Sequence, residues 1–249
     1  MSLTPPLVAR LVTAEFVAAL LVFPTLLMIP APYGRYRRPG FGPMMPARLA
    51  WVLMELPAVV VPVWAFLAAG GASRGPVPWL LLALWELHYV QRTFVFPFAM
   101  RGRRATKPVL TAALAVLFNV VNGVGNGASL AWRAESMTPL NWLGVALFLA
   151  GLATNLHADH ILRTLRRPGE DGYRIPRGGA FRWVSAANYF GELVEWTGFA
   201  LAAMTPAAWA FAAFTAANLV PRAITHHKWY RATFPDYPVE RRAVVPFLL

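Results

Sequence analysis

Ionisable side chains within apolar stretches are the residues of this sequence that could do chemistry. Glu55 lies in the run WVLMELPAVVVP, and His88, Tyr89 and Arg92 lie in the run WELHYVQRTF. On a helix, Arg92 shares a face with Tyr89, three residues away, and with His88, four residues away. Ionisable groups are costly inside a membrane helix and are therefore functional candidates by default. The pattern indicates an active site, and a hydrogen-bonded contact between helices is the structural alternative.

A second polar group follows in the C-terminal half of the chain. Asn155 and Asp159 are spaced by four residues, and Asn188, Glu192 and Glu195 line one side of a later apolar stretch. The loop YRIPRGG lies between them, and its guanidinium groups and backbone amides suit phosphate. We interpret this arrangement as a pocket for a large anionic ligand where a membrane meets water. A metal site is not expected, because the sequence lacks a converging set of His and Asp residues.

The elements that must position these groups are apolar. Of the 249 residues, 57% are hydrophobic and 14% are charged, which is too apolar for an ordinary soluble domain. A helix needs roughly 20 apolar residues to cross a bilayer core of about 30 Å. We therefore predict an all-α, multi-pass integral membrane protein with seven transmembrane helices. The expected spans are 7–30, 49–70, 79–100, 109–132, 140–162, 186–204 and 207–225, and a tight turn at Thr205 and Pro206 joins the last two.

The distribution of positive charge predicts how these spans are oriented. Of the 23 Lys and Arg residues, 19 fall in the loops after the first, third and fifth spans or in the C-terminal region. Cytoplasmic loops are enriched in basic residues, so we expect a periplasmic N-terminus and a cytoplasmic C-terminus. The abundance of Arg and Ala suggests a bacterial genome, and hence the bacterial inner membrane. These loops explain the net charge of +12, and no binding of nucleic acid is expected.

The domain organisation is expected to be simple. No internal repeat and no low-complexity tail is found, so a single domain over residues 1–249 is predicted. The sequence has no cysteine, which excludes disulfides, thiolate metal sites and cysteine nucleophiles. The oligomeric state stays open, with a monomer as the working interpretation.

Several motifs together resemble the steroid 5-alpha-reductase family, of which this chain is identified as a bacterial member. They are ELPAVVVP from Glu55, LHYVQRTF from Leu87, NLHADHILRTLRRPGEDGYRIPRGGAF from Asn155, NYFGELVEWTGFAL from Asn188, and PRAITHHKWY with DYPVERRAVVPFLL at the C-terminal end. Their order and spacing match nearly the whole chain from about residue 49. The resemblance is most specific in the C-terminal third and weakest in the first span.

The resemblance implies reduction of the Δ4 double bond of a 3-oxosteroid, or of a similar hydrophobic enone, with NADPH as cofactor. By matching motif positions, Glu55 and Tyr89 would bind the substrate carbonyl. The residues that would hold NADPH are Arg103, Asn155, Asp159, Arg166, Tyr173, Asn188, Glu192, Arg222, His226 and Tyr230. The substrate side would be mainly the first four helices, and the NADPH side mainly residues 101–107 and 155–230.

The residue types suit this reaction. A phenol of ordinary pKa about 10 is neutral, yet its hydrogen bond strengthens as an enolate oxygen gains charge in a water-poor site. Tyr89 is therefore a suitable donor, and Glu55 could donate as well if burial keeps it protonated. Met54 departs from the family pattern, in which Gln often precedes the glutamate, and the missing amide bears on the range of substrates.

Two alternatives remain open from the sequence. One is a membrane S-adenosylmethionine-dependent methyltransferase of the isoprenylcysteine carboxyl methyltransferase type, whose C-terminal region is distantly similar. The other is a non-enzymatic seven-helix receptor or transporter, which leaves the combination of Glu55 with Tyr89 unexplained. The native substrate and the roles of individual Arg residues at the 2′-phosphate or the pyrophosphate also stay open.

Overall fold

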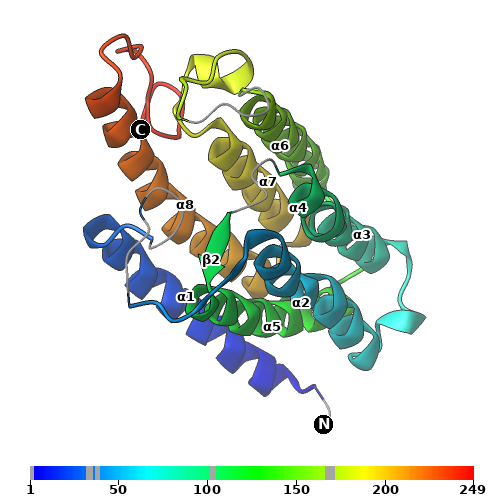
Figure 1. Ribbon diagram of the computed structural model, residues 1–249. Coiled ribbons are helices and arrows are strands. Elements are labelled where there is room, and N and C mark those ends of the chain that lie inside the picture. Colours follow the sequence, from blue (N-terminus) through cyan, green and yellow to red (C-terminus); the bar gives the residue numbers. More distant parts are fainter. Residues whose placement is uncertain (1–2, 32–35, 37–39, 101–104, 166–171) are drawn as a thin grey trace.

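The fold is a bundle of long helices (Figure 1). The computed structural model describes residues 3–31, 36, 40–100, 105–165 and 172–249. The long helices are α1 (Pro5–Met28), α2 (Ala47–Ala68), α3 (Pro76–Val90), α5 (Val109–Ala131), α6 (Pro139–Thr164), α7 (Ala187–Ala203) and α8 (Pro206–Thr233). Each overlaps one of the predicted spans. By length and apolar composition, four of the described helices could cross a membrane: α1, α2, α5 and α6.

The predicted turn between the last two helices is confirmed. Helix α7 ends at Ala203, and Met204 adopts the left-handed conformation, with φ of 51°. The side chain of Thr205 then caps α8 by accepting a hydrogen bond from the backbone N–H of Ala208 at 3.2 Å. Pro206 follows at the first position of the helix, where its missing N–H costs nothing.

A small sheet makes the all-helical prediction incomplete. Strand β1 (Met44–Pro46) pairs antiparallel with β2 (Thr106–Pro108), and Met45 lies opposite Lys107. Three residues are too few to show the alternation of polar and apolar side chains that marks a strand. The sheet joins the segment before α2 to the segment before α5, so these two helices start side by side (Figure 1).

The third predicted span is not one continuous α-helix. Helix α3 changes at residue 91 into a π-helical turn, Gln91–Val95, which is followed by the short helix α4 (Phe96–Ala99). A π-helical turn adds one residue to the helical turn and is frequent at functional sites. Arg92 lies in this turn, so its direction differs from the one that a regular helix predicts.

A seam of glycines brings α6 and α7 into backbone contact. Gly144 and Gly151 of α6 face Gly198 and Gly191 of α7, and the two glycines on each helix are seven positions apart. A Cβ atom added to Gly151 would collide with the backbone nitrogen of Glu195, and one added to Gly191 with that of Asn155. Small residues at a helix interface allow this close approach. The seam sets the polar residues of both helices next to each other.

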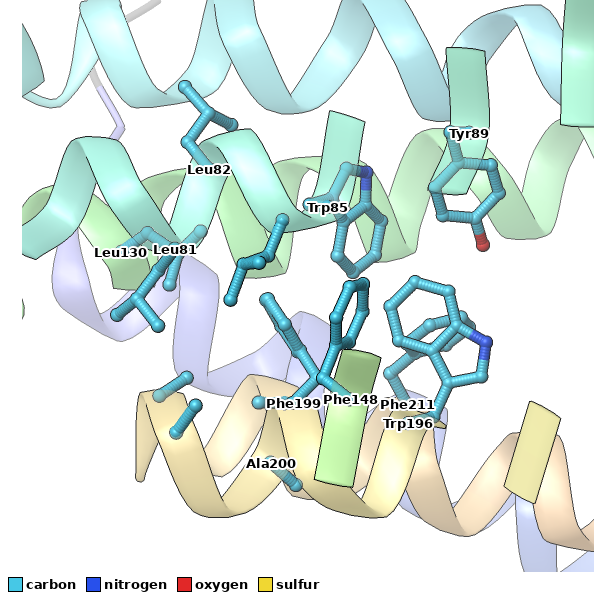
Figure 2. Packing of buried hydrophobic residues seen from close by; sticks show 14 of the residues in the cluster. Leu81, Leu82, Trp85, Tyr89, Leu130, Phe148, Trp196, Phe199, Ala200 and Phe211 are labelled. Carbon is cyan, nitrogen blue, oxygen red and sulfur yellow. The ribbon is translucent and has the colours of Figure 1, made fainter. Parts of the chain in front are cut away.

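The core beside this seam is aromatic (Figure 2). Trp85 and Tyr89, one turn apart on α3, face Trp196 of α7 and Phe211 of α8. The ring centroids of Trp85 and Trp196 are 5.3 Å apart, and those of Trp196 and Phe211 are 4.5 Å apart. The indole N–H of Trp85 donates to the carbonyl of Ala58 in α2 at 2.8 Å. Tyr89 therefore stands on a rigid aromatic platform.

The segment after α8 returns to the start of α7. Val184 pairs with Arg242, and the backbone N–H of Ser185 donates to the carbonyl of Arg242 at 2.9 Å. The hydroxyl of Ser185 also lies 2.6 Å from His227 Nδ1 and 2.6 Å from the hydroxyl of Tyr237. This network fixes the end of α8 against α7.

Candidate active site

One cavity of about 600 Å³ lies inside the bundle, with a polar part and an apolar part. Its polar lining includes Glu55, His88, Tyr89, Arg92, Lys107, Asn119, Asp159, Asn188, Glu192 and Arg222. Its apolar lining includes Leu21, Val22 and Leu26 of α1, Leu114 and Phe118 of α5, and Phe211 and Phe214 of α8. The cavity can therefore hold charged and hydrophobic groups side by side.

Arg92 lies at the centre of the ionisable groups. Its Nε atom is 3.8 Å from Glu55 Oε1, and its Nη2 atom is 3.8 Å from Glu192 Oε2. The guanidinium also lies over the rings of Trp51 and Phe96, at 5.1 and 5.3 Å from their centroids. Arg92 thus joins the carboxylate of α2 to that of α7 through the π-helical turn.

Glu55 also contacts α5. Asn119 Nδ2 donates to the backbone carbonyl of Met54 at 2.7 Å and lies 3.5 Å from Glu55 Oε2. The hydrogen bond to Met54 holds the Asn119 amide in place, so its Nδ2 atom is directed toward Glu55 as well. The side chain of Met54 points to Lys107, whose Nζ atom is 3.9 Å from the sulfur.

Tyr89 is buried, with 5% of its surface exposed, and its side chain lines the cavity. Figure 2 shows its ring at the edge of the aromatic cluster, with the hydroxyl group directed away from Trp85. Rings of Trp85 and Trp196 hold it, at centroid distances of 5.0 and 5.6 Å. The phenol is therefore positioned by packing.

His88 and Glu195 form a buried pair beside Tyr89. His88 Nδ1 is 2.7 Å from Glu195 Oε1, and the two side chains are 2% and 0% exposed. His88 lines the cavity, whereas Glu195 lies behind it. Both lie in polar clusters of the sequence, but neither is predicted from it to have a catalytic or a cofactor-binding role. The signal in the sequence was the pair of carboxylates at 192 and 195 in an apolar helix, each of which needs a partner.

A chain of amides and a carboxylate joins α6 to α7. Asn155 Nδ2 donates to the backbone carbonyl of Asn188 at 3.0 Å, and Asn188 Nδ2 donates to Asp159 Oδ1 at 3.2 Å. Asp159 and Asn188 line the cavity, and Asn155 supports them from behind. The glycine seam makes these hydrogen bonds possible, because the backbones of α6 and α7 touch one turn away.

The remaining predicted residues that the structure describes lie on α8, except for Tyr173, which lies in the segment before α7. Arg222 lines the cavity and donates from Nη2 to the hydroxyl of Tyr189 at 2.8 Å. His226 contacts Tyr36, whose hydroxyl is 3.4 Å from His226 Nδ1. Tyr173 and Tyr230 both pack against Trp229, and neither they nor His226 line the cavity. Arg103 and Arg166 lie outside the described residues.

Lys107 adds a cation on the β2 side of the cavity. Its Nζ atom lies 3.6 Å from the ring centroid of Trp51. Burial lowers the pKa of Lys107 to about 7; Glu55 opposes this change, and Arg222 and Arg92 add to it. Within the described residues, no three or more His, Cys, Asp or Glu side chains come together as a metal site would require.

The fold and the cavity together define a class of protein: a helical membrane protein that encloses ionisable groups beside an apolar wall, as an enzyme acting on a hydrophobic molecule needs. The chain belongs to the 3-oxo-5-alpha-steroid 4-dehydrogenase family, whose sequence model matches residues 105–249. This is a family of oxidoreductases, so the chain is an enzyme and not a receptor or transporter.

Curated relatives extend this match over most of the chain. It is 47% identical over 230 residues to 3-oxo-5-alpha-steroid 4-dehydrogenase 1 of Rattus norvegicus, covering 90% of this chain and 88% of the relative. Identity to the Mus musculus protein of the same name is 46% over 249 residues, covering 98% and 97%. Identity to 3-oxo-5-alpha-steroid 4-dehydrogenase 2 of Homo sapiens is 44% over 211 residues, covering 82% of each chain.

Proposed function

We propose that this protein reduces the Δ4 double bond of 3-oxosteroids, or of similar hydrophobic enones, with NADPH. The observation that carries the proposal is the composition of the cavity in a member of this family. Glu55 and Tyr89 stand at one wall, and Asp159, Asn188 and Glu192 at another. An enone carbonyl needs hydrogen-bond donors, and a dinucleotide needs acceptors for its ribose hydroxyls and cations for its phosphates.

The cavity's donors and acceptors fit a dinucleotide. Carboxylates of Asp159 and Glu192 can accept from hydroxyl groups, and the guanidinium of Arg222 can meet a phosphate. NADPH, when bound, supplies a hydride. The residues assigned to hold it are those named from the sequence: Arg103, Asn155, Asp159, Arg166, Tyr173, Asn188, Glu192, Arg222, His226 and Tyr230.

The protein's own part in the reaction is to bind, orient and exclude water. Tyr89 donates a hydrogen bond to the carbonyl oxygen, which gains charge as the enolate develops. Glu55 binds beside it in its protonated form. Glu192 supports that form, because the two carboxylates share the single cation Arg92, and a proton on one of them balances the charge. The apolar lining from α1, α5 and α8 takes the body of the steroid.

The proposed setting is a bacterial inner membrane. We propose seven spans in one domain, a periplasmic N-terminus, a cytoplasmic C-terminus and a monomer. The steroid side is mainly the first four spans, and the NADPH side is mainly residues 101–107 and 155–230. A sterol-like substrate enters from the bilayer, and the charged cofactor enters from the Arg-rich cytoplasmic face.

The direct test is consumption of NADPH by the purified protein with a Δ4-3-oxosteroid, followed by identification of the product. A saturated 3-oxosteroid formed in step with NADPH oxidation is the expected result. Protection against heat by S-adenosylmethionine, and not by NADPH, would instead favour the methyltransferase alternative.

The cofactor assignment has its own test. Asn188→Ala removes the amide that bonds Asp159, and Arg166→Ala removes a cation assigned to a phosphate. Both variants are expected to weaken NADPH binding, measured as the concentration of NADPH that protects against heat. Unchanged affinity in both variants contradicts the assignment.

A further inference from the structure

The buried pair of His88 and Glu195 has no part in the function proposed above. Glu195 Oε1 lies 2.7 Å from His88 Nδ1. A carboxylate at this nitrogen favours the form in which Nδ1 carries a hydrogen, and it stabilises the imidazolium. In that form Nε2 also carries a proton. Because Glu195 takes up Nδ1, Nε2 is the nitrogen that is available to the cavity, which His88 lines.

Packing alone does not account for this pair. A buried ion pair contributes to stability only when its remaining polar atoms are satisfied. Glu195 Oε2 is buried and has no hydrogen-bond partner within the described residues. Around the pair lie the rings of Trp196 and Tyr89, at 4.7 and 5.0 Å from that of His88. An apolar pair of the same size would fill this place at lower cost, so a chemical task is the better explanation.

Reduction of an enone needs a proton as well as a hydride. The hydride adds to the β-carbon, and the resulting enolate must gain a proton at its α-carbon. Other ionisable cavity groups have other neighbours: Asp159 accepts from Asn188, Glu192 lies 3.8 Å from Arg92, and Lys107 lies over the ring of Trp51. His88 precedes Tyr89 in the chain by one position, and its ring contacts that of Tyr89 edge to face. The α-carbon is bonded to the carbonyl carbon. A substrate whose carbonyl is held by Tyr89 therefore has its α-carbon near the part of the cavity that Tyr89 and His88 line.

We infer that His88 is the acid that delivers this proton, with Glu195 as its charge partner. This inference rests on the proposed reduction. The nicotinamide reductant provides the hydride, and the electron pair of the C=C bond passes through the enolate to the α-carbon. That carbon takes the proton from His88 Nε2, a C–H bond forms, and the N–H bond breaks. His88 is left neutral beside ionised Glu195 and regains its proton from water when the site opens.

The test is the fate of solvent deuterium in the product. Turnover is run in D₂O, and the ketone is reduced to an alcohol at once to stop exchange at the α-carbon. NMR then shows on which face of that carbon the deuterium lies. A proton delivered by a fixed side chain enters from one face, so the wild type is expected to give a single stereoisomer.

His88→Gln is expected to lower kcat about 100-fold, the size of a lost general acid, and to spread deuterium over both faces. The concentration of NADPH that protects this variant against heat should stay within twofold of the wild-type value, a difference of about 0.4 kcal/mol in binding free energy. A kcat within threefold of the wild type, or deuterium still on one face, overturns the inference.

Glu195→Gln provides a second test that keeps the shape of the pair. Its amide leaves the imidazolium without a counter-charge, so proton delivery becomes slower and the solvent isotope effect on kcat rises above that of the wild type. A lowered kcat with an unchanged isotope effect would mark a structural role and overturn the inference. The matched control is Glu86→Gln, on the same helix as His88 (α3) but outside the cavity lining, with kcat and isotope effect expected to be unchanged.

The two proposals fail in different ways. A wild-type protein that reduces no enone overturns the proposed function and this inference with it. A wild type that reduces a Δ4-3-oxosteroid, and whose His88→Gln variant delivers deuterium as stereospecifically, overturns the inference alone.

Discussion

Arg92 is the residue on which the charges of the cavity converge. It lies 3.8 Å from both Glu55 and Glu192. These distances are longer than a direct hydrogen bond of 2.7–3.2 Å, so the cation acts through its charge and leaves the carboxylate oxygens available to ligands. A single side chain thus connects the proposed substrate wall with the proposed cofactor wall.

Tyr89 is expected to matter for turnover more than for cofactor binding. Tyr89→Phe keeps the ring on its aromatic platform and removes only the hydroxyl group. Loss of one donor to a developing oxyanion typically lowers kcat by about 10²–10³. Steady-state kinetics with a Δ4-3-oxosteroid, together with heat protection by NADPH, measure the two effects separately. Equal losses of turnover and of NADPH affinity would assign Tyr89 to cofactor binding or folding.

Lys107 is expected to make stability depend on pH. Its pKa is about 7 in the folded protein and about 10.5 in an unfolded chain. Between these values the unfolded chain binds the extra proton, so the free energy of unfolding rises with pH, by at most about 1.4 kcal/mol per pH unit. Below pH 7, Lys107 is protonated in both the folded and the unfolded protein, and burial of its charged ammonium group lowers stability by its full amount.

The measurement compares melting temperatures of the wild type and Lys107→Met between pH 7 and 10. Methionine keeps the length of the side chain and removes the charge. The wild type should gain stability with rising pH relative to the variant over this window. A constant difference between the two proteins would show that Lys107 keeps an ordinary pKa.

At the scale of elements, the seam between α6 and α7 sets the geometry of the site. Glycines at 144, 151, 191 and 198 let the two backbones touch. Asp159 and Asn188 are then within hydrogen-bond distance, although they are far apart in the sequence. The π-helical turn after α3 acts in the same way, because it aims Arg92 between α2 and α7.

Gly151→Ala is expected to open this seam. The added methyl group meets backbone atoms of Glu195 and Gly191, which cannot move aside as a flexible side chain would. Overpacking of this kind costs about 1–3 kcal/mol, seen as a lower melting temperature with weaker NADPH protection.

The matched control is Gly125→Ala on α5. A Cβ atom there meets only Val12 and Ala207, at 3.7 and 3.9 Å, which is ordinary contact. Alanine favours a helix over glycine by up to about 1 kcal/mol, so this variant should be as stable as the wild type or slightly more so. Equal destabilisation by both substitutions would contradict the role of the seam.

At the scale of the whole molecule, the proposed orientation of the chain rests on charge and apolar length together. The basic residues cluster in alternate loops. A fluorescent reporter fused after Leu249 is expected to fold and fluoresce in the cytoplasm. Alkaline phosphatase should be active when fused near Gly75 or Glu135, because these loops are assigned to the periplasm. The opposite pattern of activities would reverse the assigned orientation.

The sequence by itself determined the helices closely. Six of the seven stretches predicted as spans match a single helix to within a few residues at most ends. Four of these helices are long and apolar enough to cross a membrane, and there a bilayer demands about 20 apolar residues whatever the neighbours are. The main excess is at the end of α8, which continues to Thr233 past the predicted limit of 225. Its last turns carry polar residues, so hydropathy alone ends the span too early. The sequence also indicated Glu55 and Tyr89 as candidates, since such groups are costly in apolar stretches.

Only the tertiary structure decided which of these groups meet. Sequence spacing predicts neighbours three or four residues apart, whereas His88 and Glu195 are 107 residues apart. Their pairing depends on which helix faces adjoin, and that follows from the glycine seam and the aromatic core. In the same packing His88 lines this cavity, whereas Tyr173, His226 and Tyr230 lie outside its lining. Local pattern therefore located the helices, and side-chain packing between distant segments assembled the site.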